Sequence, residues 1–362
     1  MKNSIIFFFG VLLMVSSCKE ARDQMKEDLK PTARGEVGEI ILIMDSTQWI
    51  GPLGEQIKSM YRAPMPGLPQ PEPMFDLSKV NPLKINDVFR SSANMIFVMT
   101  LDSETSQSLR IREYFTNKSL KMIQGDSSLF MAIHRDEFAK GQIVLYLFSQ
   151  SEELLIKKLK ENEDQLVGIF ENSAIESTKD KLFKSKETTL MKALKEDFGF
   201  EISIPYGWEL AKQNKNFVWL RRLEASSEQD IFIHSERYTD QSIFENIGAY
   251  RDKITETFLR DSEKPDKYIT RQLQEYVPLE TKQISFKGRF AIEARGLWKI
   301  SDNSGGGPFV SYTIVDEANQ RVYYIEGYVY SPGTNKKNLV REVNAILSTF
   351  SLPPAENSAA MQ

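Results

Sequence analysis

The chain is poor in the residues that build metal sites and disulfides. Its 362 residues include one cysteine, Cys18, and two histidines, His134 and His234. A single cysteine excludes an intramolecular disulfide, and it leaves too few thiolates for a cysteine-rich zinc site. One histidine lies in each half of the chain, and both lie in candidate strands. We interpret them as ordinary strand residues rather than as zinc ligands, since a zinc site needs three or four ligands. We therefore expect no metal and no cofactor.

Sequence motifs of common catalytic sites are also lacking. The chain has no Gly-x-Ser-x-Gly elbow, no Walker loop, no His-Glu-x-x-His and no dinucleotide-binding glycine pattern. A Ser-His-Asp triad can be assembled from distant positions, so a hydrolase with an unmarked active site remains an alternative. A mainly structural scaffold is a further alternative. We interpret the chain as a non-catalytic binding or accessory protein and assign no catalytic residue.

No apolar run of the chain is long enough to span a bilayer, which takes about 20 residues. The run from Ile5 to Val15 follows the positive charge of Lys2 and has the length of a signal-peptide core. The tetrapeptide Val15-Ser16-Ser17-Cys18 that ends it resembles a bacterial lipobox. This resemblance implies cleavage before Cys18 and attachment of palmitate or similar acyl chains to its sulfur and its new amino group.

A lipid on Cys18 determines where the protein is expected. Two or more acyl chains hold a protein stably on a membrane, whereas one chain binds only marginally. We expect a signal peptide over residues 1–17, a lipidated tether over 18–35, and anchoring to the outer membrane of a cell envelope. The periplasmic face is preferred over the cell surface. The alternative is that Cys18 is an ordinary apolar residue inside the signal peptide.

The charge balance is mild. Lys and Arg total 46 and Asp and Glu total 50, a formal net charge of −4 that becomes −5 when Lys2 is removed with the signal peptide. Nothing in this balance favours nucleic acid. The partners we expect are the membrane, through the lipid, and another envelope protein.

Hydrophobic patterning predicts two domains of the α+β class, at residues 36–198 and 199–352, with a disordered tail at 353–362. We expect two sandwich-type domains with mainly antiparallel sheets, joined by a long helical segment over Ser151–Phe198 that continues unbroken or breaks near Asn172-Ser173. The strands predicted for the first domain are Glu39–Met44, Asn94–Leu101, Leu129–His134 and Gln142–Phe148. Those predicted for the second are Phe200–Ile204, Phe217–Arg222, Asp230–Arg237, Tyr268–Tyr276, Ile284–Ile292, Gly296–Ile300, Phe309–Asp316 and Arg321–Tyr330. Helices are predicted near Glu55–Arg62, Gln107–Asn117, Gln241–Leu259 and Lys336–Phe350.

Several phrases resemble an uncharacterised lipoprotein family of Bacteroidota. They are residues 30–35, 44–54, 62–73, 306–312 and 323–327, of which the proline-rich stretch 62–73 is the most specific. The family is a domain of unknown function, so the resemblance implies lipidation and no activity. Residues 200–350 more weakly resemble the sandwich shared by photosystem oxygen-evolving accessory proteins and Mog1-like proteins, which implies a fold alone.

Two segments are candidate binding sites, and two others are better explained by the fold. Asp45, Trp49, Gly51 and Gly54 follow a buried strand, where ligands often bind beside helix amides; alternatively, Asp45 caps a helix and Trp49 packs in the core. The segment from Arg62 to Phe75 contains Pro64, Met65, Pro66 and Leu68, and it forms either a partner-binding apolar surface or a stiff connection. We interpret Ser304–Pro308 as a hairpin tip rather than a ligand cradle. In Arg321–Tyr330, core packing explains the tyrosines better than a binding face does.

Overall fold

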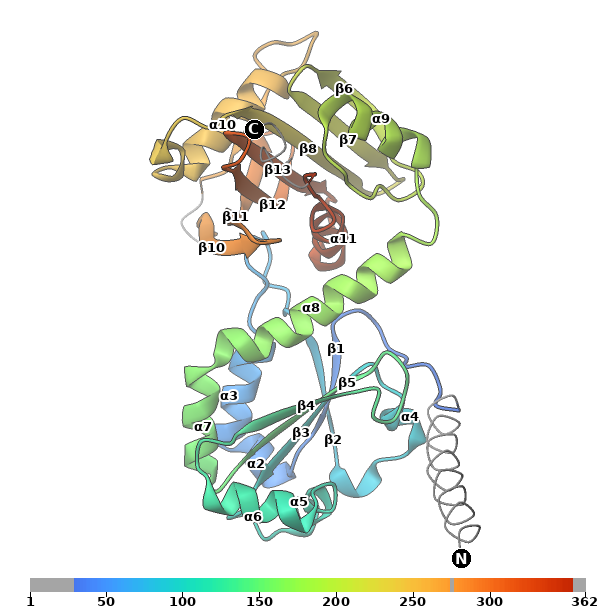
Figure 1. The fold of residues 1–362 in the computed structure, drawn as a ribbon, viewed down its shortest axis with the longest axis vertical. Helices are drawn as coiled ribbons and strands as arrows, with labels where there is room; N and C mark the ends of the chain where they lie inside the picture. Colours follow the sequence, from blue (N-terminus) through green and yellow to red (C-terminus); the bar gives the residue numbers. More distant parts are fainter. Residues whose placement is uncertain (1–28, 274–276, 354–362) are drawn as a thin grey trace, which may run out of the picture. The chain divides into compact units, whose positions relative to one another are not determined.

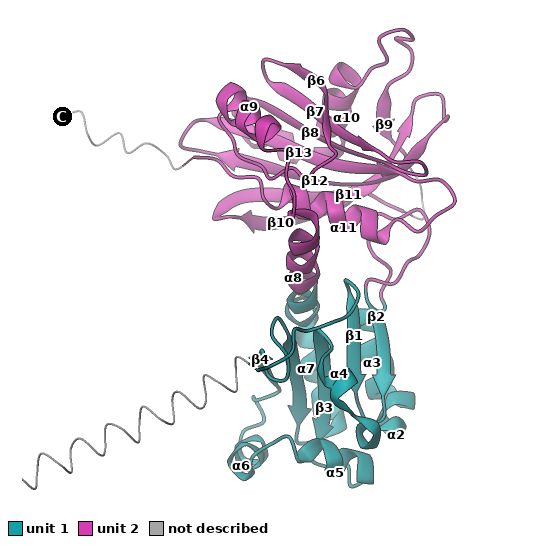
Figure 2. Ribbon diagram, turned by 90° about the vertical axis from the view of Figure 1, so that its right-hand side faces the viewer, with its two compact units in different colours: residues 1–62, 75–170 teal, residues 63–74, 171–362 magenta. Residues whose placement is uncertain are grey.

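The computed structural model describes residues 29–273 and 277–353. The expected signal peptide, Cys18 and almost all of the expected tail therefore lie outside the described residues. The chain divides into two compact units, and Figure 2 colours them separately. Unit 1 holds the described residues up to 62 together with 75–170, and unit 2 holds 63–74 together with residues from 171 onward.

Unit 1 is built on a five-stranded sheet with the order β2-β1-β3-β5-β4 (Figure 1). Its strands are β1 (Glu39–Ile43), β2 (Asp76–Val80), β3 (Asn94–Thr100), β4 (Met131–Arg135) and β5 (Ile143–Ser149). Its helical elements are α2 (Ser46–Ile50), α3 (Pro52–Tyr61), η1 (Pro82–Lys84), α4 (Asp87–Arg90), α5 (Ser106–Arg112), α6 (Asn117–Gly125) and α7 (Glu152–Glu161). Every residue of β3 and β5 is buried, as in a sheet covered on both faces.

The sheet of unit 1 corrects one part of the expected fold. The α+β class is confirmed, and β4 and β5 form the expected antiparallel pair. However, β2, β1, β3 and β5 run parallel to one another, whereas mainly antiparallel pairing was expected. The physical reason lies in the connections, because the chain passes through helices between these strands and returns to start each one at the same edge.

Unit 2 contains an eight-stranded antiparallel sheet. Seven of its strands follow the order β10-β11-β12-β13-β8-β7-β6, and the eighth, β9, pairs with β11. Its strands are β6 (Glu209–Asn214), β7 (Phe217–Leu223), β8 (Glu228–Arg237), β9 (Ile269–Arg271), β10 (Glu280–Phe286), β11 (Arg289–Ile300), β12 (Gly306–Asp316) and β13 (Arg321–Tyr330). Its helical elements are α9 (Thr188–Phe198), η2 (Gln241–Phe244), α10 (Ile247–Phe258) and α11 (Lys337–Leu347). The expected antiparallel sheet is confirmed here.

Helices pack on both faces of this sheet because side chains alternate along each strand. On β8, Ile231 and Ile233 belong to the core that includes residues of α9 and α11. Phe232, between them, belongs to the aromatic core that includes residues of α10. Tyr324 and Tyr328 of β13 are buried in that same aromatic core, which confirms that they serve packing.

The helical segment after β5 differs from the expectation. It consists of α7, α8 (Glu163–Leu182) and α9, and α8 runs through residues 172–173 without a break. The first break falls at Asn162, which ends α7. The units divide inside α8, between residues 170 and 171, rather than at the expected 198/199 position. Leu194 of α9 accordingly belongs to the unit 2 core.

Two strand predictions in unit 2 also need correction. Residues 200–204 form no strand, although Glu201 makes an isolated bridge with Ser351. The predicted strand Ile284–Ile292 is split by a turn, where Lys287 and Gly288 both have positive φ. That turn joins β10 to β11, which continues unbroken to Ile300. Among the described residues, no helix is both long and apolar enough to cross a membrane.

Candidate functional site

Asp45 stands at the carboxyl end of β1, where the order of the parallel strands reverses. Ligands of open α/β sheets often bind at such a switch point. Here, however, the carboxylate accepts hydrogen bonds from the backbone N–H groups of Thr47 and Gln48, at 2.8 and 3.2 Å, and from the hydroxyls of Thr47 and Thr105. Burial by itself would raise the pKa of Asp45, but these hydrogen bonds together lower it. The helix-capping interpretation of Asp45 is therefore confirmed.

The three other residues predicted near Asp45 serve the packing of α2 on α3. The Lys58 ammonium lies 4.2 Å from the centre of the Trp49 ring and donates to the Trp49 carbonyl. A Cβ at Gly54 would lie 2.0 Å from that carbonyl oxygen, so only glycine allows this approach. Gly51 ends α2 and precedes Pro52 at the start of α3. The structure brings these residues together, but their contacts are internal to the fold.

The proline-rich segment corrects a second prediction. Met65 and Leu68 are buried in the core of unit 2, and Phe75 is fully buried against Tyr61 and Phe170 in unit 1. Of the remaining predicted contact residues, Arg62 and Pro64 are exposed and Pro66 is half-buried. The expected apolar surface is wrong for the three apolar side chains, because burying them in the cores removes them from water.

Glu72 fastens this segment to the start of α11. Its carboxylate oxygens accept hydrogen bonds from the backbone N–H groups of Lys336, at 2.7 Å, and Lys337, at 3.1 Å. The Arg341 guanidinium donates to the carbonyl of Met74. Glu72 therefore supplies the acceptor that the first N–H groups of a helix need, from a position 264 residues away in the sequence. Residues 63–74 are thus an integral part of unit 2.

Near this attachment lies a cleft, which we call the polar cleft, with a volume of about 350 Å³. Three distant segments of unit 2 meet there: the proline-rich segment, the hairpin tip between β11 and β12, and the turn before α11. The lining residues are Pro69, Gln70, Gln272, Leu297, Lys299, Asn303, Gly305, Gly306, Gly307, Pro332, Gly333 and Lys336. Sequence reasoning noted two of these segments separately, but nothing in their spacing indicated that they meet.

The polar cleft is lined by two lysines and by the glycines at the start of β12. The Lys299 ammonium donates to the Asn303 side-chain oxygen at 3.0 Å. Lys336 is only 5% exposed, and its ammonium donates to the Thr334 carbonyl at 2.7 Å. A Cβ at Gly307 would lie 2.0 Å from the Val329 carbonyl oxygen, so glycine is required for β12 to approach β13 this closely.

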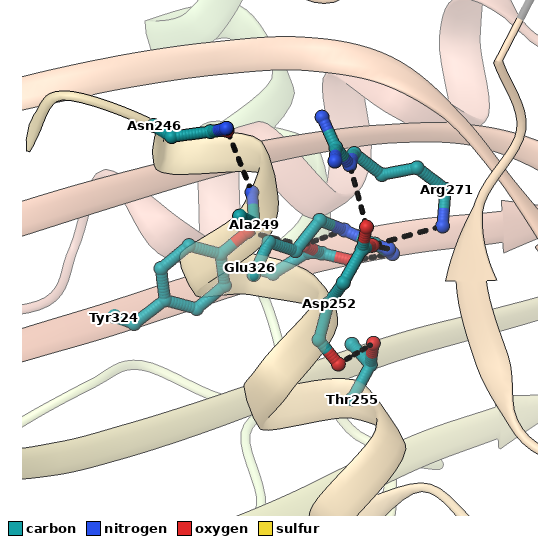
Figure 3. A network of polar contacts seen from close by, with 8 residues as sticks. Asn246, Ala249, Asp252, Thr255, Arg271, Tyr324 and Glu326 are labelled. Atoms are coloured by element: carbon teal, nitrogen blue, oxygen red, sulfur yellow. Dashed lines mark hydrogen bonds and ion pairs between the residues drawn. The ribbon is translucent and has the colours of Figure 1, made fainter. Parts of the chain in front are cut away.

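A buried ion pair holds α10 against the sheet on the aromatic face of unit 2 (Figure 3). The Arg251 guanidinium makes a two-point contact with the Glu326 carboxylate, at 2.8 and 2.6 Å, and the Tyr324 hydroxyl donates to the same carboxylate. Arg251 and Glu326 are 1% and 0% exposed. Burial raises the pKa of Glu326, and Arg251 opposes that rise. Both oxygens of the Glu326 carboxylate are thus used inside the fold, and removing either partner would leave the other charge buried without its counterion.

The two histidines lie in different units. His134 lies in unit 1, where its Nδ1 atom is 3.1 Å from the Glu137 carboxylate. His234 lies in unit 2, where burial lowers its pKa. Within residues 29–273 and 277–353, no group of three or more His, Cys, Asp and Glu side chains is placed to hold a metal ion.

Comparison with known proteins gives two family matches, one for each half of the chain. Residues 33–183 match the model of a domain of unknown function (DUF8532), and residues 187–349 match that of another (DUF4837). No curated protein matches the chain.

Among solved structures, one of a protein from Bacteroides thetaiotaomicron is similar at 6% identity and a TM-score of 0.25. That match covers 43% of this chain and 46% of the other, so this chain spans about half of it. The Ran-binding protein Mog1p of Saccharomyces cerevisiae is similar at 9% identity and a TM-score of 0.29, over 42% of this chain and 90% of its own. The human StarD13 lipid transfer and protein localization domain is similar at 9% identity and a TM-score of 0.22, over 45% of this chain and 95% of its own. Likenesses this weak carry no argument about function.

Proposed function

We propose that this chain is a lipid-anchored binding protein of a bacterial cell envelope. The anchor is the lipid on Cys18, the membrane is the outer membrane of a Bacteroidota cell, and the binding site is the polar cleft of unit 2. The observation that supports the anchor is the tetrapeptide Val15-Ser16-Ser17-Cys18 directly after a short apolar run. Acyl chains at this point keep the two units at the membrane surface, where they meet other envelope components.

The polar cleft is the observation that carries the binding function. It is formed by three segments that are far apart in the sequence, and one of them is held there by the paired hydrogen bonds of Glu72. Its polar groups are side-chain amides, ammonium groups and glycine backbone, which bind and orient a ligand. Its volume lies in the range of small-ligand sites. We therefore assign it recognition rather than chemistry.

The anchor is tested by replacing the lipidated residue. Cells that express the full chain are fed a radioactive fatty acid, and the protein is recovered and counted. We expect Cys18→Ala to lose the label and normal processing, whereas Lys19→Ala, one residue away, keeps both. Equal incorporation in Cys18→Ala and the unmodified chain would refute the anchor.

Binding through the cleft is tested by filling it. Gln70 lines the cleft and is exposed, so Gln70→Trp places a large ring there at little cost to folding. Gln213→Trp, on the exposed strand β6 outside the cleft, is the matched control. Crosslinking in intact cells is expected to capture an envelope component with the control and with the unmodified chain, but not with Gln70→Trp. The same captured species with all three would refute the cleft as the binding site.

A further inference from the structure

We infer that the polar cleft binds a small anion, through a carboxylate or phosphate group held between Lys299 and Lys336. This inference rests on the proposed function, because it gives the chemical class of the ligand at the same site. Beside the charged group, the ligand carries hydroxyl or amide groups that match the neutral polar lining.

The charge of the lining indicates an anion. Lys299 and Lys336 contribute two positive charges, and none of the twelve lining residues is Asp or Glu. The carboxylate of Glu72 contacts Lys336 through the backbone N–H, where both of its oxygens serve the start of α11. The described contacts of both ammonium groups go to neutral oxygens, so a carboxylate or phosphate is the partner that completes them.

Lys336 is the more telling of the two cations. An ammonium group has three N–H donors. In the described structure one of them meets the Thr334 carbonyl at 2.7 Å, and a second makes a long contact of 3.4 Å with the Gln70 side chain. One donor is left for a ligand, although the residue is nine-tenths buried. A buried charge without a charged partner is costly, and a bound anion removes that cost.

The neutral part of the lining defines the rest of the ligand. Gln70, Gln272 and Asn303 each offer a side-chain amide, which both donates and accepts hydrogen bonds. The glycines at 305–307 and 333 add no side chains to the wall, so a ligand can approach the backbone closely. A volume of about 350 Å³ admits a group of monosaccharide or dipeptide size. An acidic sugar or a sugar phosphate has the combination of charge and hydroxyls that this lining matches.

The experiment is a calorimetric titration of the full lipidated chain in detergent micelles at low salt. The probes are D-glucuronate, which carries a carboxylate, D-glucose 6-phosphate, which carries a phosphate, and D-glucose, which has no charge. We expect at least one anionic sugar to bind at least tenfold more tightly than glucose, and the stronger of the two identifies the charged group. Binding should weaken between 50 and 500 mM salt because salt screens the half-buried Lys299, while the more deeply buried Lys336 is screened less.

Lysine variants locate the effect. Lys299→Met and Lys336→Met, which keep most of the apolar stem, should each weaken binding of the anionic sugar about tenfold, and the double variant should weaken it further. Lys192→Met is the control, since Lys192 is exposed on α9 and paired at 3.7 Å with Glu196. Near-ultraviolet circular dichroism checks that each variant is folded.

Three results would overturn the inference: glucose binding as tightly as both anions, anion binding that survives the double variant, or no saturable binding of either anion. The proposed function fails separately, through unchanged capture of a partner by Gln70→Trp. If no anion binds while Gln70→Trp still loses its partner, the anion inference falls and the binding function stands.

Discussion

Removing the Glu72 carboxylate should release the proline-rich segment from unit 2. Glu72→Ala takes away both acceptors at the start of α11, at 2.7 and 3.1 Å from the N–H groups they satisfy. A hydrogen bond to a charged group contributes about 1.5–3 kcal/mol, and helix-capping groups about 0.5–2 kcal/mol. Because water can partly replace the lost partners, we expect a total local loss of about 3 kcal/mol.

Hydrogen exchange measured by mass spectrometry gives this loss directly. At about 1.4 kcal/mol for each factor of ten, the first turn of α11 and residues 63–74 should exchange about 100-fold faster in Glu72→Ala. Glu72→Gln keeps an oxygen acceptor without the charge, so its exchange rate should lie between those of Glu72→Ala and the unmodified chain. Glu209→Ala is the control, because that carboxylate is 58% exposed and pairs with Arg221 at the surface. Exchange in Glu72→Ala at the rate of the unmodified chain would refute the attachment.

Three further changes test the account of the fold. Arg251→Met leaves the Glu326 carboxylate buried without its partner and should lower the free energy of unfolding in urea by about 3–5 kcal/mol. Adding Glu326→Leu should recover part of that loss, and a double variant no more stable than Arg251→Met would contradict this. Gly307→Ala forces a Cβ against a backbone oxygen at 2.0 Å and should destabilise by more than about 2 kcal/mol, whereas Gly125→Ala meets nothing within 4 Å and should have little effect. Because the pKa of Asp45 is lowered in the folded state, its contribution to stability is present above its unfolded pKa and is lost as pH falls through the folded value. Asp45→Asn should therefore flatten the fall of stability in acid below about pH 4, and an unchanged acid profile in unfolding experiments would count against this role.

Local patterns in the sequence predicted much of the fold. Alternating and continuous apolar runs marked β3, β5, β8, β12 and β13 closely, because a buried strand needs an unbroken apolar face. The same runs could not tell parallel from antiparallel pairing in unit 1, since a strand buried on both faces looks the same in either arrangement. The turn at Lys287-Gly288, where both residues have positive φ, was missed because Phe286 precedes it and Phe290 follows two residues after it.

The candidate site was harder to predict than the fold. Asp45 was identified from its place after a strand, and a helix cap is a local signal within three residues. Met65 and Leu68 were expected at the surface because prolines surround them, whereas their burial depends on a core assembled from residues more than a hundred positions away. The contact of Glu72 with α11 spans 264 residues, and no short pattern carries such a pairing. Since the sequence does not reveal that contact, the glycine-rich tip at 304–308 was interpreted as an ordinary turn.

The most direct test of the binding function is crosslinking in intact cells with the cleft filled and unfilled. If the polar cleft recognises an envelope component, Gln70→Trp loses the captured species while Gln213→Trp and the unmodified chain retain it. Capture of the same species at equal yield by all three proteins would contradict that role.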